Sequence, residues 1–209
     1  MKTSFKYYCT FIMLFCFVNY GFSQKETAKW KALIALGLNS PSQGGFVEGF
    51  EGNTVNFPTI NLGVQRMFTP KYGVKLDLGY NRFGVENELF ENKINYTRVN
   101  AQLVYDTSQV FYFLPQNLTL VGHIGPGYSM VKPLGDFKDN DVSYLNAMAG
   151  IEIHHYVSRT VNVFADVSYI YGFSSDFENV ESGLGSFNGN VATLTFGVAI
   201  SLSGCVTCN

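Results

Sequence analysis

Charged residues are scarce in this 209-residue chain. Asp, Glu, Lys and Arg together make up 14% of it, against about 25% in a typical soluble domain. The basic residues form no continuous stripe, which excludes nucleic acid as a partner. The connecting segments carry no D-x-D-x-D-G pattern, which excludes a dedicated calcium loop. The chain is instead rich in aromatic residues, at 16%, and has 21 glycines. This composition predicts an all-β protein with part of its surface facing something other than water.

Cysteine is also scarce, with four residues in the whole chain. Cys205 and Cys208 form a C-x-x-C pair close to the final residue. In an oxidising compartment this pair is a possible local disulfide. A redox or metal role would need further ligands or a supporting fold, and neither is visible. We interpret residues 203–209 as a passive periplasmic tail.

The first 23 residues have the three parts of a secretory signal peptide. Lys2 and Lys6 form a basic region, residues 7–18 form an apolar stretch too short to span a bilayer, and Gly21 and Ser23 suit a cleavage site after Ser23. A retained anchor helix is the alternative. After this leader, no segment reaches the ~18 continuous apolar residues of a transmembrane helix. Removal of the two lysines takes the formal net charge from −2 to −4.

The rest of the chain alternates between apolar and polar residues, which indicates β-strands with two different faces. In residues 161–173, for example, Val163 and Val167 alternate with Asn162 and Asp166. Eight segments show this pattern. The predicted strands span 29–39, 58–68, 72–83, 94–105, 118–130, 144–156, 161–173 and 191–202.

The connections between these strands decide which face meets which environment. Residues 40–56, 84–93, 132–143 and 173–190 form long or mid-length loops, whereas 69–71 and 157–160 are tight turns; 106–117 is the exception. Long loops at one end and short turns at the other are typical of an outer-membrane barrel. We therefore predict an eight-stranded antiparallel up-and-down transmembrane β-barrel over residues 29–202, preceded by a periplasmic segment at 24–28. The alternative is a two-faced soluble sandwich.

Aromatic and basic residues near the strand ends fit the headgroup zones of a membrane. Arg66 and Arg82 fall on the lipid-facing phase but close to strand ends, where a long side chain can reach the interface. The aromatic residues assigned to this zone are Trp30, Tyr72, Tyr80, Tyr105, Tyr128, Tyr144, Tyr156, Tyr169 and Tyr171.

The polar face of the strands carries a set of charges that a barrel would enclose. An eight-stranded barrel is just wide enough to be filled by its own side chains, so these charges must be paired. Glu152 and Asp166 lie on neighbouring strands and need Lys75 or Arg98 beside them, or one of them takes up a proton. The set is either a salt-bridge plug or a gate or proton-linked switch. The predicted lumen residues are Lys31, Lys75, Asp77, Arg98, His123, Glu152 and Asp166.

The loops and the adjacent histidines are further candidate sites. The acidic residues of the long loops outnumber the basic ones and give these loops a formal charge of −8. Such loops either hold divalent cations that bridge lipopolysaccharide, bind a partner, or are simply solvated. His154 and His155 point to opposite faces of a strand and cannot easily share an ion. We predict no metal site and no cofactor.

The glycine-rich LVGHIGPGYSMV (120–131) and the ending LTFGVAISL (194–202) make the chain resemble small eight-stranded outer-membrane barrels over residues 28–202. These are of the OmpA transmembrane-domain and OmpX type and, in style, the short barrels of Bacteroidota. The resemblance implies a Gram-negative outer membrane, contact with lipid and lipopolysaccharide, and a monomer. Some barrels of this size are deacylases, but the H-x-S spacing is absent, because Tyr156 and Val157 follow His155.

We therefore predict a non-enzymatic barrel that anchors acidic loops and has an envelope-stabilising or surface-binding role. The first alternative is a narrow or gated pore lined by Arg98, Glu152 and Asp166. The second is an accessory barrel of a larger secretion or uptake complex in the envelope, which a resemblance to PorT-like barrels implies.

Overall fold

The computed structural model describes residues 30–86, 91–108, 110, 114–115, 117–174, 177 and 180–202. The predicted signal peptide (1–23), the segment 24–28 and the C-x-x-C tail (203–209) lie outside these ranges. Within the described ranges, no helix is long and apolar enough to cross a membrane.

Eight long strands form the body of the molecule, and a ninth, β2, is a two-residue addition. The strands are β1 (Trp30–Pro41), β2 (Glu51–Gly52), β3 (Asn56–Met67), β4 (Tyr72–Glu86), β5 (Glu91–Asp106), β6 (Leu118–Pro133), β7 (Val142–Tyr156), β8 (Val161–Phe173) and β9 (Val191–Ser201). Three short helical turns lie in the loops: η1 (Gln43–Gly45), η2 (Gly135–Phe137) and α2 (Val180–Gly183).

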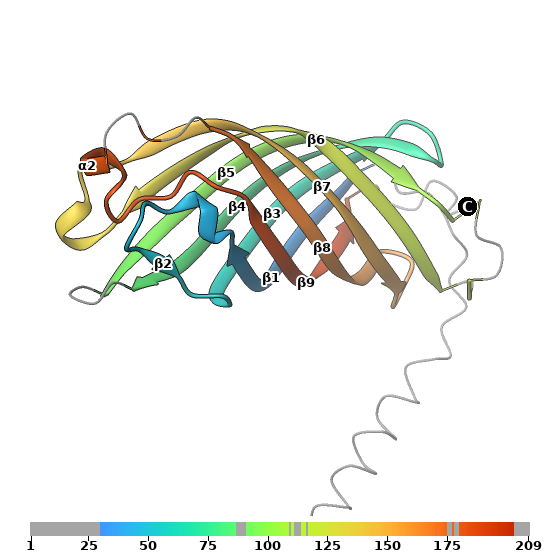
Figure 1. The fold of residues 1–209 in the computed structure, drawn as a ribbon. Helices are drawn as coiled ribbons and strands as arrows, with labels where there is room; N and C mark the ends of the chain where they lie inside the picture. Colours follow the sequence, from blue (N-terminus) through green and yellow to red (C-terminus); the bar gives the residue numbers. More distant parts are fainter. Residues whose placement is uncertain are drawn as a thin grey trace, which may run out of the picture.

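The eight long strands close into a barrel (Figure 1). Their order is β4-β3-β1-β9-β8-β7-β6-β5, every neighbouring pair is antiparallel, and pairing of β5 with β4 completes the circle. This confirms the predicted fold. The main differences lie at the β4–β5 connection, where pairing of Gly84 with Lys93 and of Val85 with Asn92 turns most of the predicted 84–93 loop into a hairpin.

The outward face of the barrel is apolar and the inward face is polar, the reverse of a soluble protein. Leu103 is 66% exposed beside Gln102 at 2%, and Val167 is 62% exposed beside Asp166 at 3%. Since the two members of each pair are adjacent on one strand, the alternation must separate an apolar environment outside from a polar lumen inside.

Two aromatic residues of the predicted interfacial set lie on the inward phase. Tyr156 is one, because its cross-strand partner Asn162 is buried on the lumen side, and Tyr144 is the other. Tyr144 lies inside the barrel, 6% exposed, and its hydroxyl donates to the Gly189 carbonyl at 3.2 Å. The phase of β7 explains this, because Leu145 occupies the outward position next to it and is 63% exposed.

The two ends of the barrel differ. At what we call the turn end, β3–β4 and β7–β8 are joined by tight turns, with Phe68 N–H donating to Tyr72 O at 2.9 Å and Val157 N–H donating to Val161 O at 3.0 Å. The first residue of β1 and the last of β9 also lie there. The opposite end, which we call the loop end, carries η1, β2, η2 and α2 (Figure 1).

At the loop end, three connections fold together into a structure that we call the cap, made of residues 42–55, 134–141 and 180–190. Backbone hydrogen bonds join the first and third segments, from Ser42 N–H to Asn190 O at 2.8 Å and from Asn188 N–H to Gly45 O at 3.0 Å. The Asn140 side chain joins the second segment to the third by donating to the Leu184 carbonyl at 3.0 Å.

Phe187 ties the cap to the barrel. Its ring is fully buried and lies 4.9 Å from that of Phe46 in the cap, 5.1 Å from that of Phe83 on β4 and 6.3 Å from that of Tyr96 on β5 (ring centroids). An apolar cluster of cap and strand side chains therefore fills the loop end of the lumen.

Candidate functional site in the barrel lumen

The middle of the lumen is built around the fully buried guanidinium of Arg98 on β5. Its Nη1 donates to Asp77 Oδ2 at 2.5 Å and to Asn100 Oδ1 at 3.0 Å, and its Nη2 donates to Asn61 Oδ1 at 3.0 Å. Gly79 makes room for this group, because a Cβ there would lie 2.6 Å from the Arg98 Cζ. The charge is thus neutralised by a carboxylate and oriented by two amides, as a buried charge requires.

A second ion pair crosses the lumen from β4 to β7. Lys75 Nζ donates to Glu152 Oε1 at 2.6 Å, and both side chains are buried. The other carboxylate oxygen, Oε2, lies 2.6 Å from His154 Nε2. His154 is held in turn by Asn162 at 3.0 Å and by stacking on Phe164 at 5.1 Å between ring centroids.

Asp166 on β8 forms a third cluster directly beside the second. Asp166 and Glu152 are cross-strand partners. The Asp166 Oδ1 atom accepts from Ser168 Oγ at 2.7 Å and lies 3.2 Å from His123 Nε2. Gly150 allows this approach, since a Cβ there would be 2.2 Å from Ser168 Oγ and 2.5 Å from His123 Nε2. The two carboxylates therefore have separate partners, Lys75 for one and His123 for the other.

Lys31, the remaining predicted lumen residue, is buried on β1 but forms no ion pair within 4.0 Å among the described residues. The structure thus brings six of the seven predicted residues into ion pairs or charged contacts and leaves the seventh apart from them.

Ser168, His123 and Asp166 are a serine, a histidine and an acid in one place, a set that the sequence analysis did not find. In a nucleophilic relay the acid binds one ring nitrogen and the serine the other. Here His123 Nε2 faces both partners, at 3.4 Å from Ser168 Oγ and 3.2 Å from Asp166 Oδ1, while Nδ1 has no hydrogen-bond partner among the described residues. All three side chains are buried, so this geometry does not activate the hydroxyl for attack on a substrate.

The same region offers three possible metal ligands, because donor atoms of His123, Glu152 and Asp166 lie within 4.8 Å of one another. Both oxygens of Glu152 already contact Lys75 and His154 at 2.6 Å. An ion here would compete with the Lys75 ammonium for the same carboxylate. The arrangement therefore suits an internal ion-pair network better than a metal centre.

Uncharged polar side chains, which the sequence analysis did not single out, extend the network toward the loop end. Asn100 Nδ2 donates to Asn146 Oδ1 at 2.5 Å, Asn146 Nδ2 donates to Ser129 Oγ at 2.8 Å, and Ser129 shares a 2.7 Å hydrogen bond with Tyr96. Their phase on the strands was the available signal, because each lies on the same face as a predicted lumen charge.

Among the described residues, the space between the charged groups of the lumen is small. Between Lys75, Asp77, Glu152 and Asp166 lies a cavity of about 10 Å³, roughly the room of one water molecule. At the turn end, Leu33, Ala35, Phe164 and Ala199 form an apolar cluster, and Met67, Val104 and Val121 form another. Apolar clusters thus adjoin the polar network toward both ends, and Lys31 and Asn162 are buried beside the turn-end cluster.

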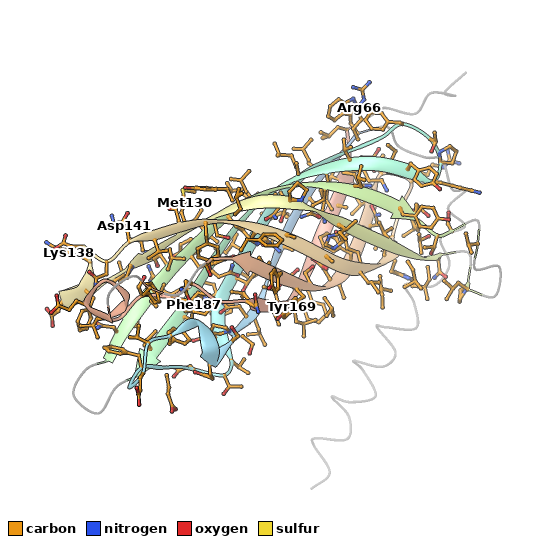
Figure 2. The ribbon with its side chains drawn as sticks, turned by 45° about the horizontal axis from the view of Figure 1, so that its top comes forward. Arg66, Met130, Lys138, Asp141, Tyr169 and Phe187 are labelled. Carbon is orange, nitrogen blue, oxygen red and sulfur yellow. The ribbon has the colours of Figure 1, made fainter. Side chains whose placement is uncertain are left out.

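The acidic loop residues whose side chains the structure describes lie elsewhere, on the outside of the cap; Glu86, Glu88, Glu91, Asp176 and Glu178 are outside this described set. The carboxylate residues whose side chains are described as exposed there are Glu48, Glu51, Asp136, Asp139, Asp141 and Glu181. Figure 2 shows Lys138 and Asp141 at this end, far from Arg66 at the other.

No protein-family model matches the chain, and no curated protein matches its sequence. Solved structures do match. A major outer membrane protein from Thermus thermophilus matches with a TM-score of 0.55 at 13% identity, over 84% of this chain and 99% of that one. Neisserial surface protein A matches with 0.53 at 15% identity, over 83% and 96%. OprG from Pseudomonas aeruginosa matches with 0.52 at 13% identity, over 85% and 98%.

These likenesses show that the chain has the fold of small bacterial outer-membrane β-barrels. At such low identity they show the fold alone. The narrower resemblance to OmpA, OmpX or PorT-like barrels stays a prediction.

Proposed function

We propose that this protein is a non-conducting barrel of the outer membrane of a Gram-negative bacterium, which holds an ordered acidic cap at the cell surface for an envelope-stabilising or surface-binding role. The observation that carries the proposal is the filled lumen. Ion pairs tie β4 to β5 and β4 to β7, and apolar clusters lie toward both ends. A conducting path would have to break these contacts and leave buried charges unpaired, which is strongly unfavourable.

The outward face supports a location in a membrane. Along β4 the outward residues run from Tyr72 through Val74, Leu76 and Leu78 to Tyr80. At a rise of about 3.3 Å per residue this row is roughly 26 Å long, or about 20 Å along the membrane normal at a tilt of ~40°, close to the ~25 Å apolar band of such barrels. The tyrosines at both ends suit the two headgroup zones.

The cap supports a surface role. Its interior is aromatic, with the Phe50 and Phe137 rings 5.6 Å apart, while its carboxylates are exposed. Hydrogen bonds between its segments order the cap. A ligand or partner would therefore bind a preformed acidic surface and not flexible loops. The absence of enzymatic activity is part of the proposal, and the geometry around His123 supports it.

Single-channel recording of the refolded protein without residues 1–23 tests the proposal. We expect no unitary current steps from this protein or from its Asp166→Asn variant, because the lumen is blocked at several levels. Heat-modifiable migration shows whether each sample has folded, and Asp139→Asn, in the exposed cap, is the matched control. Unitary steps from the folded, unaltered protein would contradict the proposal, and steps that Asp166→Asn changes and Asp139→Asn does not would favour a gated pore.

A further inference from the structure

The outward-facing basic residues at the loop end gather on one side of the barrel. Arg82 on β4, Lys93 on β5 and Lys132 on β6 all lie on the outward phase of three adjacent strands. Over the described residues of β1, β3, β7, β8 and β9, no Lys or Arg faces outward at this end. We call the surface formed by these three residues together with Tyr80 and Asn95 the basic wall.

Strand register places the central members of the basic wall in one row. Arg82 is the cross-strand partner of Asn95, and Asn95 is the partner of Lys132. Neighbouring strands are about 4.8 Å apart, so the two cations lie on either side of the Asn95 amide at a spacing that one anionic headgroup can bridge. Lys93 lies on the same face, two residues along β5 from Asn95.

The Arg82 guanidinium is already oriented. Its Nε donates to Asn95 Oδ1 at 2.9 Å, and the same oxygen accepts from the Tyr80 hydroxyl at 2.8 Å. The Tyr80 ring centroid lies 6.0 Å from the Arg82 Cζ. Among the described side chains, Arg82 forms no ion pair, and its two terminal nitrogens have no hydrogen-bond partner. Two parallel N–H groups of this kind match the oxygens of a phosphate.

The basic wall faces outward at the loop-end edge of the apolar band of the barrel. This position points to the kind of ligand that it binds. Toward the turn end, Tyr80 of the wall is in register with Thr97 and Met130, and the row after that is the exposed apolar set Leu78, Val99 and Tyr128. Beyond the wall toward the loops, β6 leads into the cap, where Asp136, Asp139 and Asp141 are exposed. The cations thus lie between an apolar band and an acidic loop end, at the depth of lipid headgroups.

We propose that the basic wall binds the phosphate of an anionic lipid of the outer leaflet, such as the phosphorylated lipid A part of lipopolysaccharide. The site rests on the proposed membrane location, but it is separate from the lumen and from the cap. Charge complementarity and the lateral orientation favour a membrane lipid over a soluble acidic partner, which would approach from the cap.

The test compares binding of bisphosphorylated lipid A with that of dephosphorylated lipid A, measured by native mass spectrometry of the folded protein released from detergent micelles. The variant is Arg82→Ala/Lys132→Ala. The matched control is Arg66→Ala/Arg159→Ala, which removes two exposed arginines at the turn end. We expect the variant to weaken binding of the phosphorylated lipid by at least about ten-fold, the effect of losing charge-assisted hydrogen bonds, and the control to change it by less than about two-fold. Arg82→Lys keeps the charge but loses the two parallel N–H groups of the guanidinium. Its binding of the phosphorylated lipid should lie between that of the variant and that of the control.

Equal binding of the two lipids to the unaltered protein, or equal losses in the variant and the control, would overturn the inference alone. A protein that fails to migrate as a folded, inserted barrel in any bilayer would overturn the proposed function and this inference with it.

Discussion

Replacing Arg98 with Met is expected to lower the free energy of unfolding by about 3–5 kcal/mol, the usual effect of removing one partner of a buried ion pair. The change leaves Asp77 inside the lumen without its cation, and it leaves the Asn61 and Asn100 oxygens without their donor. Urea-induced unfolding of the barrel in lipid vesicles, followed by heat-modifiable migration, measures the change.

Two comparisons make the Arg98→Met result specific. Arg159→Met removes an exposed arginine from a turn and should change stability by no more than about 0.5 kcal/mol. Arg98→Lys keeps a charge but cannot reach all three acceptors at once, and should be intermediate. If Arg98→Met were as stable as Arg159→Met, the Asp77–Arg98 pair would not hold the lumen together.

Replacing Phe187 with Ala is expected to lower the free energy of unfolding by about 3–5 kcal/mol and to loosen the cap. The ring is fully buried between cap and barrel, so its removal leaves a cavity that the rigid strands cannot close. Hydrogen exchange should quicken at the Asn188 and Asn190 amides, which donate to Gly45 O and Ser42 Oγ in the folded cap.

The matched control for Phe187→Ala is Phe57→Ala. Phe57 lies at the same end of the barrel but is 61% exposed, and its removal should have little effect on exchange in the cap. Equal exchange rates in the two variants would show that Phe187 does not anchor the cap.

The fold could be predicted from the sequence because alternation alone sets the direction of every side chain on a strand. The strand at residues 161–173 has the same bounds in the prediction and in the structure. The prediction that Tyr144 lies at the membrane interface was wrong, because its residue type was given more weight than its phase on the strand. The cap was missed because its segments have no periodicity, and Phe187 lies among Ser, Gly and Asn residues that indicate only a loop.

The lumen contacts were harder to predict than the lumen residues. Phase shows that Lys75 and Glu152 both face inward, but 77 positions separate them in the chain, and only the stagger and closure of the barrel decide which charges meet. The same holds for Arg98, which contacts Asp77 and not Glu152. His154 was predictable in principle, because it follows Glu152 by two residues on the same strand and therefore shares its face.

The measurement that tests the central claim most directly is a double-mutant cycle on Lys75 and Glu152, which tie β4 to β7 across the lumen. Lys75→Met, Glu152→Gln and the double variant are compared by urea unfolding in vesicles. We expect each single change to lower the free energy of unfolding by about 3–5 kcal/mol, and the double variant to lose at least about 2 kcal/mol less than the sum. Effects that add to within about 0.5 kcal/mol would contradict a lumen closed by this ion pair.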